Sequence, residues 1–239
     1  MARLHVSRDG RILLCMCERY VIPDQDEVEH EISLRHGWWK FTARFNVGIF
    51  QNVPVIRLHA GESEGVMMRW GIIPSWAKGE PTKQKAAHAD IDTMERSNLF
   101  RESWWQARRC ILPAAGFYTW QKTSEGHRQP FFVRVVNRPV FAMAGLWATT
   151  ENEDGDDVIE SCALVTVPQN SLLNDVNNTS SRMPAILRRE DYHTWLSGTP
   201  VKAKAVLKTY PNDLMLTHPV SPRINRADDD DPSLIRAVL

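Results

Sequence analysis

A series of short apolar runs separated by polar turns occupies the middle of the chain and most constrains its fold. Polar stretches such as AGESEG (60–65) and TSEGHR (123–128) separate neighbouring runs. Runs of this length, bounded by turns that contain Gly and Ser, are typical of strands joined by hairpins. The middle of the chain is therefore predicted to form antiparallel sheet. The runs are VPVIRL (53–58), VMMRWGII (66–73), FYTWQK (117–122), PFFVRVV (130–136), VFAMAGLWATT (140–150) and IESCALVTV (159–167).

Four other segments carry a helical pattern. They are DQDEVEHEISLRH (24–36), TMERSNLFRESWWQARR (93–109), REDYHTWL (189–196) and KAKAVLKTY (202–210). The first of them is acidic at its start and basic at its end, which suits the helix dipole. No repeat, low-complexity linker or shift in composition divides the 239 residues. The sequence therefore predicts one sheet-rich α+β domain with helices at its margins.

The first seventeen residues carry a separate signal. RLHVS and ILLCMC lie on either side of RDGR, and apolar runs around an Asp-Gly pair predict a β-hairpin. Met16 offers a second translation start directly before Cys17. Residues 1–15 are therefore interpreted as an N-terminal extension and residues 16–239 as a single domain. Whether the native start is Met1 or Met16 is left open by the sequence.

The charge balance excludes a chain that is basic throughout. Lys plus Arg and Asp plus Glu both total 29, so the net charge is zero and any surface for nucleic acid must be local. No stretch reaches the roughly 18–20 apolar residues of a membrane helix. The start MARLHVSRDG lacks the apolar core of a signal peptide. We therefore expect a cytoplasmic protein with no membrane partner.

The four cysteines stand at positions 15, 17, 110 and 162. Cys15 and Cys17 have C-x-C spacing without the further ligands of a zinc site, so no metal and no cofactor are expected. In a cytosolic chain Cys15 and Cys17 should be free thiols. Cys110 and Cys162 lie within apolar runs and are predicted to be small buried strand residues.

Eight phrases, in order, resemble the SRAP (SOS-response-associated peptidase) family, whose members are also described as abasic-site processing proteins. They are MCERY (16–20), RFNV (44–47), RWGIIPSWAK (69–78), RRCILPAAGFYTWQK (108–122), QPFFV (129–133), AGLW (144–147), SRMPAIL (181–187) and HPVS with DDPSLI (218–221, 230–235). They span nearly the whole chain. The resemblance implies antiparallel sheets that form an open barrel-like core with flanking helices. It also implies a site for single-stranded DNA at an abasic position, with the sugar aldehyde trapped by an N-terminal cysteine.

The chemistry explains why such a family needs its cysteine at the first position. A free α-amine, with a pKa of roughly 7.7 to 8.0, condenses with an aldehyde at neutral pH. The adjacent thiol then adds to the imine and closes a five-membered thiazolidine ring. An internal cysteine has no free amine and forms only a reversible thiohemiacetal. Cys17 is thus the candidate nucleophile, provided that translation starts at Met16 and this methionine is removed.

The sequence departs from the family pattern at the residues expected to assist Cys17. His88 stands at the family's Asn position, Thr119 at its Glu and Ser180 at its His. Asp90 replaces an Arg, which is expected to weaken phosphate binding. Glu18 follows the cysteine where the family has Gly. His88 and Glu18 are either relocated catalytic groups, with Glu18 as the compensating acid, or residues that drifted after catalysis ceased.

Part of the family's DNA surface remains, namely Arg19, Trp70, Trp76, Trp120 and Arg182. Trp120 is expected to stack on an unpaired base, a contact worth roughly 1–3 kcal/mol. For at least one of the three tryptophans, packing in the core is the alternative. The acidic run 227–231 is expected to be a solvated turn.

Two hypotheses follow from the site. In the first, the chain is an enzyme-like protein of the DNA-damage response that crosslinks to abasic sites in single-stranded DNA and associates with the nucleoid. In the second, it is a catalytically inactive relative that keeps a groove for DNA or for a protein partner. A thiol peptidase acting on other proteins is a remote third, because no His or Asn/Asp partner for Cys17 stands at a matched position. The sequence leaves open whether this chain is an enzyme.

Overall fold

The computed structural model describes residues 18–32, 34, 36, 37, 39–80, 84–152 and 157–238. The predicted hairpin of residues 1–17 and Cys17 itself lie outside these residues. The first described residue, Glu18, directly precedes a strand.

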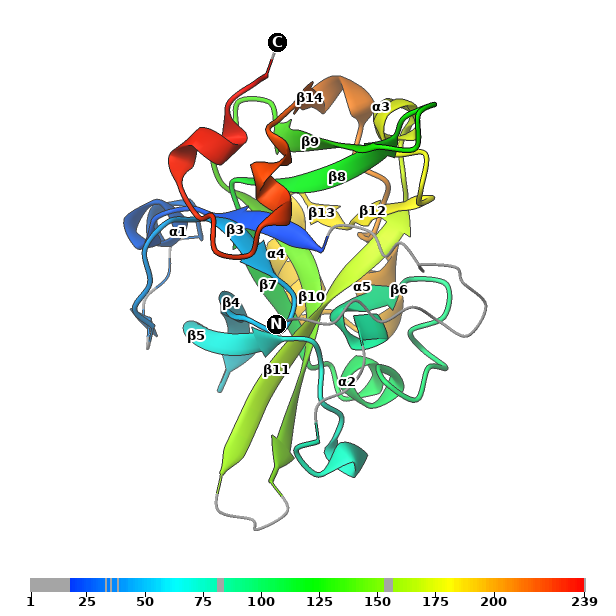
Figure 1. The fold of residues 1–239 in the computed structure, drawn as a ribbon. Coiled ribbons are helices and arrows are strands. Elements are labelled where there is room, and N and C mark those ends of the chain that lie inside the picture. The colour runs from blue at the N-terminus through cyan, green and yellow to red at the C-terminus, as the bar shows by residue number, and fades with distance from the viewer. Residues whose placement is uncertain are drawn as a thin grey trace.

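One sheet of the described chain has the strand order β14-β9-β8-β1-β3, and its strand pairs are antiparallel. The hairpin of β8 and β9 surrounds the predicted turn at 123–127, as the alternation of apolar and polar residues indicated. The strand β1 lies between β3 and β8, in the upper half of the view in Figure 1. The strands of this sheet are β1 (Arg19–Ile22), β3 (Arg44–Gly48), β8 (Gly116–Lys122), β9 (Arg128–Val135) and β14 (Met215–Pro219).

The second sheet follows the order β12-β11-β10-β7-β4-β5-β2, with β13 on β10 and β6 on β11. An additional parallel pairing between β5 and β11 joins the two ends of the run β5-β4-β7-β10-β11, so these strands close into a ring. Its strands are β2 (His36–Gly37), β4 (Asn52–His59), β5 (Glu62–Trp70), β6 (His88–Asp90), β7 (Arg109–Ala114), β10 (Phe141–Glu151), β11 (Val158–Pro168), β12 (Arg182–Pro184) and β13 (Ile186–Leu187).

Short helices lie around the sheets (Figure 1). The helical prediction over 93–109 holds only for α2, because residues 91–100 form a series of turns and Ala107 ends the helix with a positive φ of 54°. The helices are α1 (Gln25–Ile32), α2 (Arg101–Trp105), α3 (Ser171–Val176), α4 (Tyr192–Ser197) and α5 (Pro200–Ala205). Short 3-10 helices cover Ser75–Ala77, Gln84–Ala87, Arg189–Asp191, Asn212–Leu214, Pro222–Asn225 and Pro232–Ile235.

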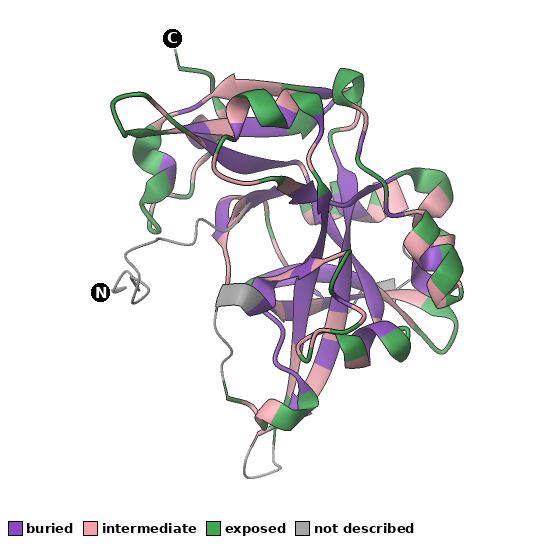
Figure 2. Ribbon diagram, turned by 90° about the vertical axis from the view of Figure 1, so that its right-hand side faces the viewer, coloured by how far each residue is buried: buried purple, intermediate pink, exposed green. Residues whose placement is uncertain are grey.

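Buried residues follow the strands, and exposed residues follow the helices and connecting turns (Figure 2). Trp70, Trp104 and Trp195 are among the largest fully buried side chains. Cys110 on β7 and Cys162 on β11 are buried free thiols, as predicted, and burial raises the pKa of both. No helix of the described residues is long and apolar enough to cross a membrane. The predicted α+β class with antiparallel sheets and a barrel-like core is confirmed.

Candidate functional site

The site is built around the start of β1. Arg19 lies opposite Gly48 of β3, and Tyr20 pairs with Val47 of β3 on one side and with Phe117 of β8 on the other. Because β1 is bonded on both edges, the residues that enter it are held in the middle of the sheet. Cys17, although not described itself, is two residues from Arg19 in the chain.

Glu18 comes close to the position where the carboxylate of the family pattern is missing. Tyr20 pairs with Phe117 and Val21 with Gly116, so the same register continued by two residues sets Glu18 opposite Thr119. Directly opposed residues of an antiparallel pair have side chains on one face of the sheet. Thr119 is buried at 2% exposure. If the pairing extended by these two residues, it would set the Glu18 carboxylate one strand away from position 119.

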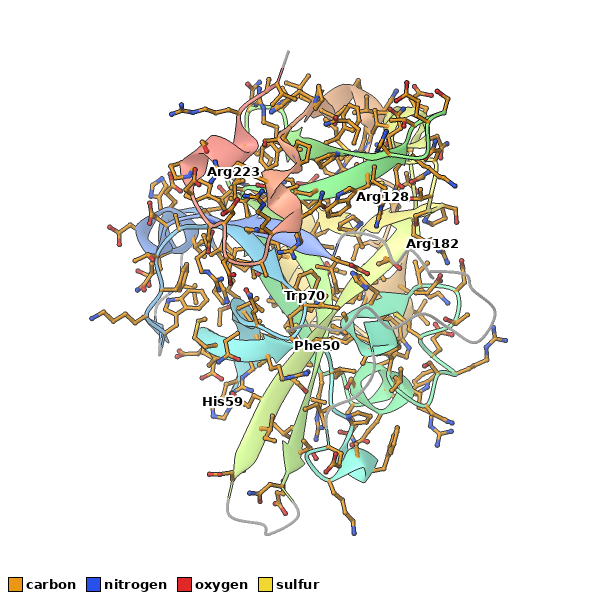
Figure 3. The ribbon with its side chains drawn as sticks, in the orientation of Figure 1. Phe50, His59, Trp70, Arg128, Arg182 and Arg223 are labelled. Atoms are coloured by element: carbon orange, nitrogen blue, oxygen red, sulfur yellow. The ribbon has the colours of Figure 1, made fainter. Side chains whose placement is uncertain are left out.

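Two cations share the surroundings of Glu18. Desolvation lowers the pKa of Arg19 and of Arg128, and the negative charge of Glu18 opposes this shift in both. Arg128 begins β9, and its guanidinium lies 5.6 Å from the centroid of the Trp120 ring (Figure 3). The sequence prediction missed Arg128. The feature that could have indicated Arg128 is its position next to the turn of a hairpin, opposite Lys122 and two strands from β1.

His88 is connected to β1 through a buried indole. The ring centroids of Trp70 and His88 are 5.8 Å apart, and those of Trp70 and Tyr20 are 5.3 Å apart, both pairs edge to face. Trp70 also donates from Nε1 to the carbonyl of Ala87 at 3.0 Å. This indole therefore packs on both the strand that follows Cys17 and the strand that begins with His88.

The position of Trp70 corrects one expectation. Its side chain is 1% exposed and belongs to the core, so it cannot present a face to a DNA base. The structure thus supports the alternative that at least one of the three tryptophans packs in the core. Trp70 contributes to the site indirectly, because it packs against Tyr20 and His88 and fixes their positions.

The other two tryptophans differ in exposure. Trp76 is 60% exposed and donates from Nε1 to the carbonyl of Asn98 at 3.2 Å. Trp120 is 8% exposed and donates to Oδ1 of Asn225 at 3.0 Å. Trp76 therefore offers an open ring, whereas Trp120 is nearly buried and has the Arg128 guanidinium over its ring, which does not support the predicted stacking on a base.

The Arg182 guanidinium forms hydrogen-bonded ion pairs with two carboxylates. Its Nε donates to Oδ2 of Asp90 at 2.7 Å, and its Nη2 donates to both Asp90 and Asp92. Desolvation acts to lower the pKa of Arg182, but these hydrogen bonds and charges raise it. The half-buried Ser180, at the family's His position, accepts from the backbone N–H of Arg182 at 3.2 Å. The Asp90 substitution thus neutralises a neighbouring arginine in addition to removing one.

The acidic run near the C-terminus forms a largely exposed turn, as expected, and it is also bonded to the rest of the fold. Asp230 accepts from the backbone N–H groups of Phe45 and Asn46 and from the Arg44 side chain. The fully buried Asn46 donates to the carbonyls of Asp229 in this run and of the preceding Arg226, and it accepts from Nη1 of Arg19 at 2.7 Å. The run is therefore bonded to β3 and, through Asn46, to Arg19.

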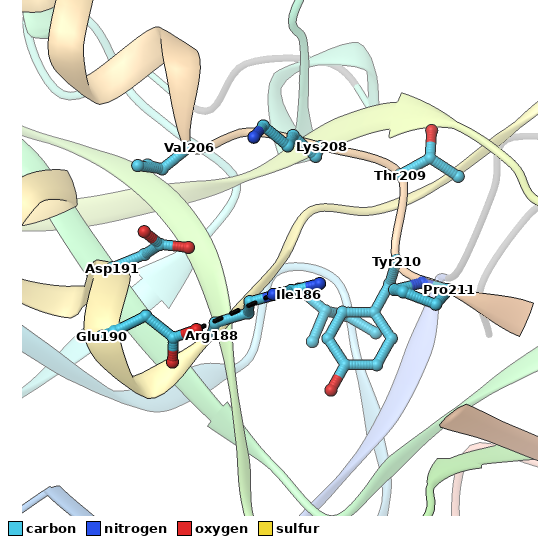
Figure 4. Close-up of a pocket in the computed structure, with 9 residues that line it drawn as sticks. All are labelled: Ile186, Arg188, Glu190, Asp191, Val206, Lys208, Thr209, Tyr210 and Pro211. Atoms are coloured by element: carbon cyan, nitrogen blue, oxygen red, sulfur yellow. Dashed lines mark ion pairs between the residues drawn. The ribbon is translucent and has the colours of Figure 1, made fainter. Parts of the chain in front are cut away.

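A cavity of about 250 Å³ lies elsewhere, between the 3-10 helix Arg189–Asp191 and the segment 206–211 (Figure 4). Its lining includes Arg188, Glu190 and Tyr210, and none of the residues predicted from the sequence. Within the described ranges, no group of three or more His, Cys, Asp or Glu side chains could hold a metal ion.

The fold is that of an α+β protein with antiparallel sheets and a barrel-like core, with a group of polar residues at the start of β1. The model of the family "SOS response associated peptidase (SRAP)" matches residues 16–227. The chain belongs to this family.

Curated relatives agree with that assignment. The abasic site processing protein YoqW of Bacillus subtilis is 30% identical over 230 residues, covering 93% of this chain and 100% of the relative. The abasic site processing protein HMCES of Xenopus tropicalis is 29% identical over 230 residues, covering 84% of this chain and 68% of HMCES.

Solved structures share the fold. A protein from Bacteroides thetaiotaomicron superposes with a TM-score of 0.78 at 22% identity, covering 93% of this chain and all of the other. A protein from Bordetella bronchiseptica gives 0.75 at 24% identity, covering 86% of this chain and all of the other.

Proposed function

We propose that this protein acts in the DNA-damage response by binding single-stranded DNA at abasic sites and trapping the sugar covalently through Cys17. The observation that carries the proposal is the family match, which begins at Met16 and so makes Cys17 the second residue of the matched segment. The names of YoqW and HMCES, abasic site processing proteins, support the substrate. A cytoplasmic location, on the nucleoid when DNA is bound, belongs to the same proposal.

The trapping step needs Cys17 to be the first residue after removal of Met16. Its α-amine attacks the aldehyde of the opened sugar, and loss of water leaves an imine. The thiolate of the same residue then adds to the imine carbon, and the imine nitrogen takes up a proton, closing the thiazolidine. Each proton transfer benefits from a general acid or base, typically by 10²- to 10⁴-fold.

Groups near the start of β1 support the relocated form of this chemistry. Glu18 supplies a carboxylate directly before β1, and the half-buried His88 supplies an imidazole connected to β1 through Trp70. Arg19 and Arg128 supply positive charge for phosphates. We assign Glu18 and His88 the proton transfers, Arg19 and Arg128 the backbone contacts, and the exposed Trp76 a stacking contact.

The test is a denaturing gel of the protein started at Met16, mixed with single-stranded DNA that carries one abasic site. Full-length protein and the Cys17→Ala variant run beside it, and mass spectrometry confirms that Met16 has been removed. A heat-stable band only with the Met16 start is expected. Absence of that band, with Cys17 shown to be N-terminal, contradicts covalent trapping.

The second candidate function is a catalytically inactive relative that retains a binding groove. The observation that favours it is the pairing of Arg182 with Asp90 and Asp92, together with the loss of acid or base groups at Thr119 and Ser180. In this case the protein binds single-stranded DNA reversibly. Fluorescence anisotropy distinguishes the two, because a bound complex that dissociates fully on denaturation is expected only for the inactive form.

A further inference from the structure

Phe50 is an exposed aromatic residue in a backbone conformation that phenylalanine seldom adopts. Its side chain is 40% exposed and its φ is 71°, in the left-handed region. A bulky residue there is strained, and such strain persists only where the surrounding structure fixes it. Phe50 lies in the turn between β3 and β4, beside the end of β5.

Hydrogen bonds on both sides of this turn hold the strained conformation. The N–H of Phe50 donates to the carbonyl of Trp70 at 2.6 Å, and the N–H of Trp70 donates to the carbonyl of Gln51 at 2.9 Å. Gly71 follows with φ +127°, and a Cβ at this position would lie 2.8 Å from the Phe50 ring. The ring therefore occupies space that only a glycine leaves open.

A guanidinium backs the ring. The Cζ atom of Arg69 lies 4.7 Å from the centroid of Phe50, and Nη1 of Arg69 donates to the carbonyl of Gly71 at 2.7 Å. Desolvation lowers the pKa of Arg69, and the neighbouring Cys162 opposes this shift. One face of Phe50 is thus covered by the Arg69 guanidinium, which the hydrogen bond to Gly71 holds in place.

This turn adjoins the start of β1. Gly48 lies opposite Arg19, and a Cβ on Gly48 would be 3.7 Å from Nη1 of Arg19 and 3.9 Å from the carbonyl oxygen of Glu18. The end of β3, which leads into the turn of Phe50, therefore lies beside the residues that follow Cys17 in the chain. Figure 3 shows Phe50 next to Trp70, in the centre of the view.

We infer that Phe50, backed by Arg69, is the stacking platform for the nucleobase adjacent to the abasic position. The inference rests on the proposed function and adds to it a residue that positions the DNA. Every nucleobase has a π face, so the contact is tolerant of sequence, and a stacked base is typically worth five- to a hundredfold in affinity, in rough terms. The cation supports both the ring and the neighbouring phosphate.

The experiment uses the protein started at Met16 and oligonucleotides with one abasic site or none, each carrying 2-aminopurine directly 5′ or 3′ of the central position. The variants are Phe50→Ala, Phe50→Tyr and Arg69→Met. Leu214→Ala is the matched control, because Leu214 is also 40% exposed and lies on a 3-10 helix outside the site. Affinity is measured by anisotropy, and stacking is measured by quenching of 2-aminopurine fluorescence.

We expect Phe50→Ala to weaken binding by about five- to a hundredfold and to abolish quenching on one side of the abasic site. Phe50→Tyr and Leu214→Ala should behave like the parent protein, and Arg69→Met should fall between. If the parent protein binds and Phe50→Ala neither weakens binding nor changes quenching, the platform is refuted while the proposed function stands. If the parent protein binds neither oligonucleotide, the proposed function and the platform are both refuted.

Discussion

At the residue scale, the charge of Asp90 decides what Arg182 can do. Arg182 donates from Nε and Nη2 to Asp90 and from Nη2 also to Asp92, so its guanidinium is already paired with carboxylates of the protein. Arginines that contact DNA phosphates contribute through release of counterions, which a neighbouring carboxylate opposes. The weakened phosphate binding expected from Asp90 therefore has a local structural basis.

The substitution Asp90→Asn should free part of this charge. We expect stronger binding to single-stranded DNA, and a slope of log affinity against log salt that is steeper by up to about 0.7. Anisotropy titrations over a series of salt concentrations measure both quantities. Asp213→Asn, an exposed site on the 3-10 helix Asn212–Leu214, is the control of equal charge. An equal gain from both variants would show that net charge, and not release of Arg182, is responsible.

Glu18 is the residue whose role most directly separates the two candidate functions. If Glu18 is the relocated carboxylate, Glu18→Gln should slow thiazolidine formation by about 10²- to 10⁴-fold while reversible DNA binding stays within a few-fold. Single-turnover crosslinking followed on a denaturing gel measures the rate. If Glu18 acted only through its charge, its removal beside Arg19 and Arg128 would strengthen DNA binding. A crosslinking rate that rises or stays constant in Glu18→Gln would contradict the acid–base assignment.

At the element scale, the C-terminal segment 222–238 is bonded to the sheet by its aspartates. Asp230 binds the backbone of β3, and Arg223 pairs with both Asp229 and Asp231. Asp231 also caps the 3-10 helix Pro232–Ile235 by accepting from the N–H of Ser233. Through Asn46, the same segment holds Arg19 in place.

The docking of this segment should depend on pH in the acid range. Hydrogen bonds from the Ser233 hydroxyl and backbone N–H, and from Arg223, lower the pKa of Asp231 to about 2. An unfolded Asp titrates near 3.9, in round terms. Because the folded pKa is the lower one, the stabilisation is complete above about pH 4 and is lost as pH falls towards 2.

Carboxyl-carbon NMR titration should therefore give Asp231 an apparent pKa near 2, and Arg223→Ala should raise it. Hydrogen exchange at residues 232–238 should accelerate between pH 4 and pH 2 relative to Asp231→Asn, which lacks the titrating group. An apparent pKa of about 4 in the folded protein would refute the assignment.

At the scale of the whole molecule, Trp70 holds together parts that are distant in sequence. It packs on Tyr20 in one sheet and on His88 in the other, and its indole N–H bonds the carbonyl of Ala87. The ring of strands β4, β5, β7, β10 and β11 closes at the end of β5, where Trp70 lies opposite Cys162. Its burial thus supports the relative placement of both sheets.

Truncation of this side chain should destabilise the entire fold. We expect Trp70→Ala to lower the free energy of unfolding by about 3–5 kcal/mol, as for other buried tryptophans. Trp76→Ala, which removes an indole that is 60% exposed, should change it by about 0.5 kcal/mol or less. Urea denaturation followed by circular dichroism gives both values. Equal effects of the two substitutions would contradict a core role specific to Trp70.

The sequence by itself determined the elements whose signals are local. The run 53–58 lies within β4, the first five residues of the run 66–73 end β5, and the predicted turn 123–128 contains the connection between β8 and β9. The eight phrases were enough to indicate the family. The sequence also indicated Glu18 and His88 as substituted residues, whose catalytic roles remain predictions.

Only the tertiary structure decided which of these residues meet. Tyr20 comes opposite Phe117 because β1 joins β8 across about a hundred residues of chain, and Arg182 reaches Asp90 because β12 and β6 both pair with β11. Contacts between segments distant in sequence also place Trp70 in the core and bond the acidic run 227–231 to β3. The physical reason is that a side chain's burial and partners depend on contacts between strands far apart in sequence, whereas local patterns report only the conformation of each strand.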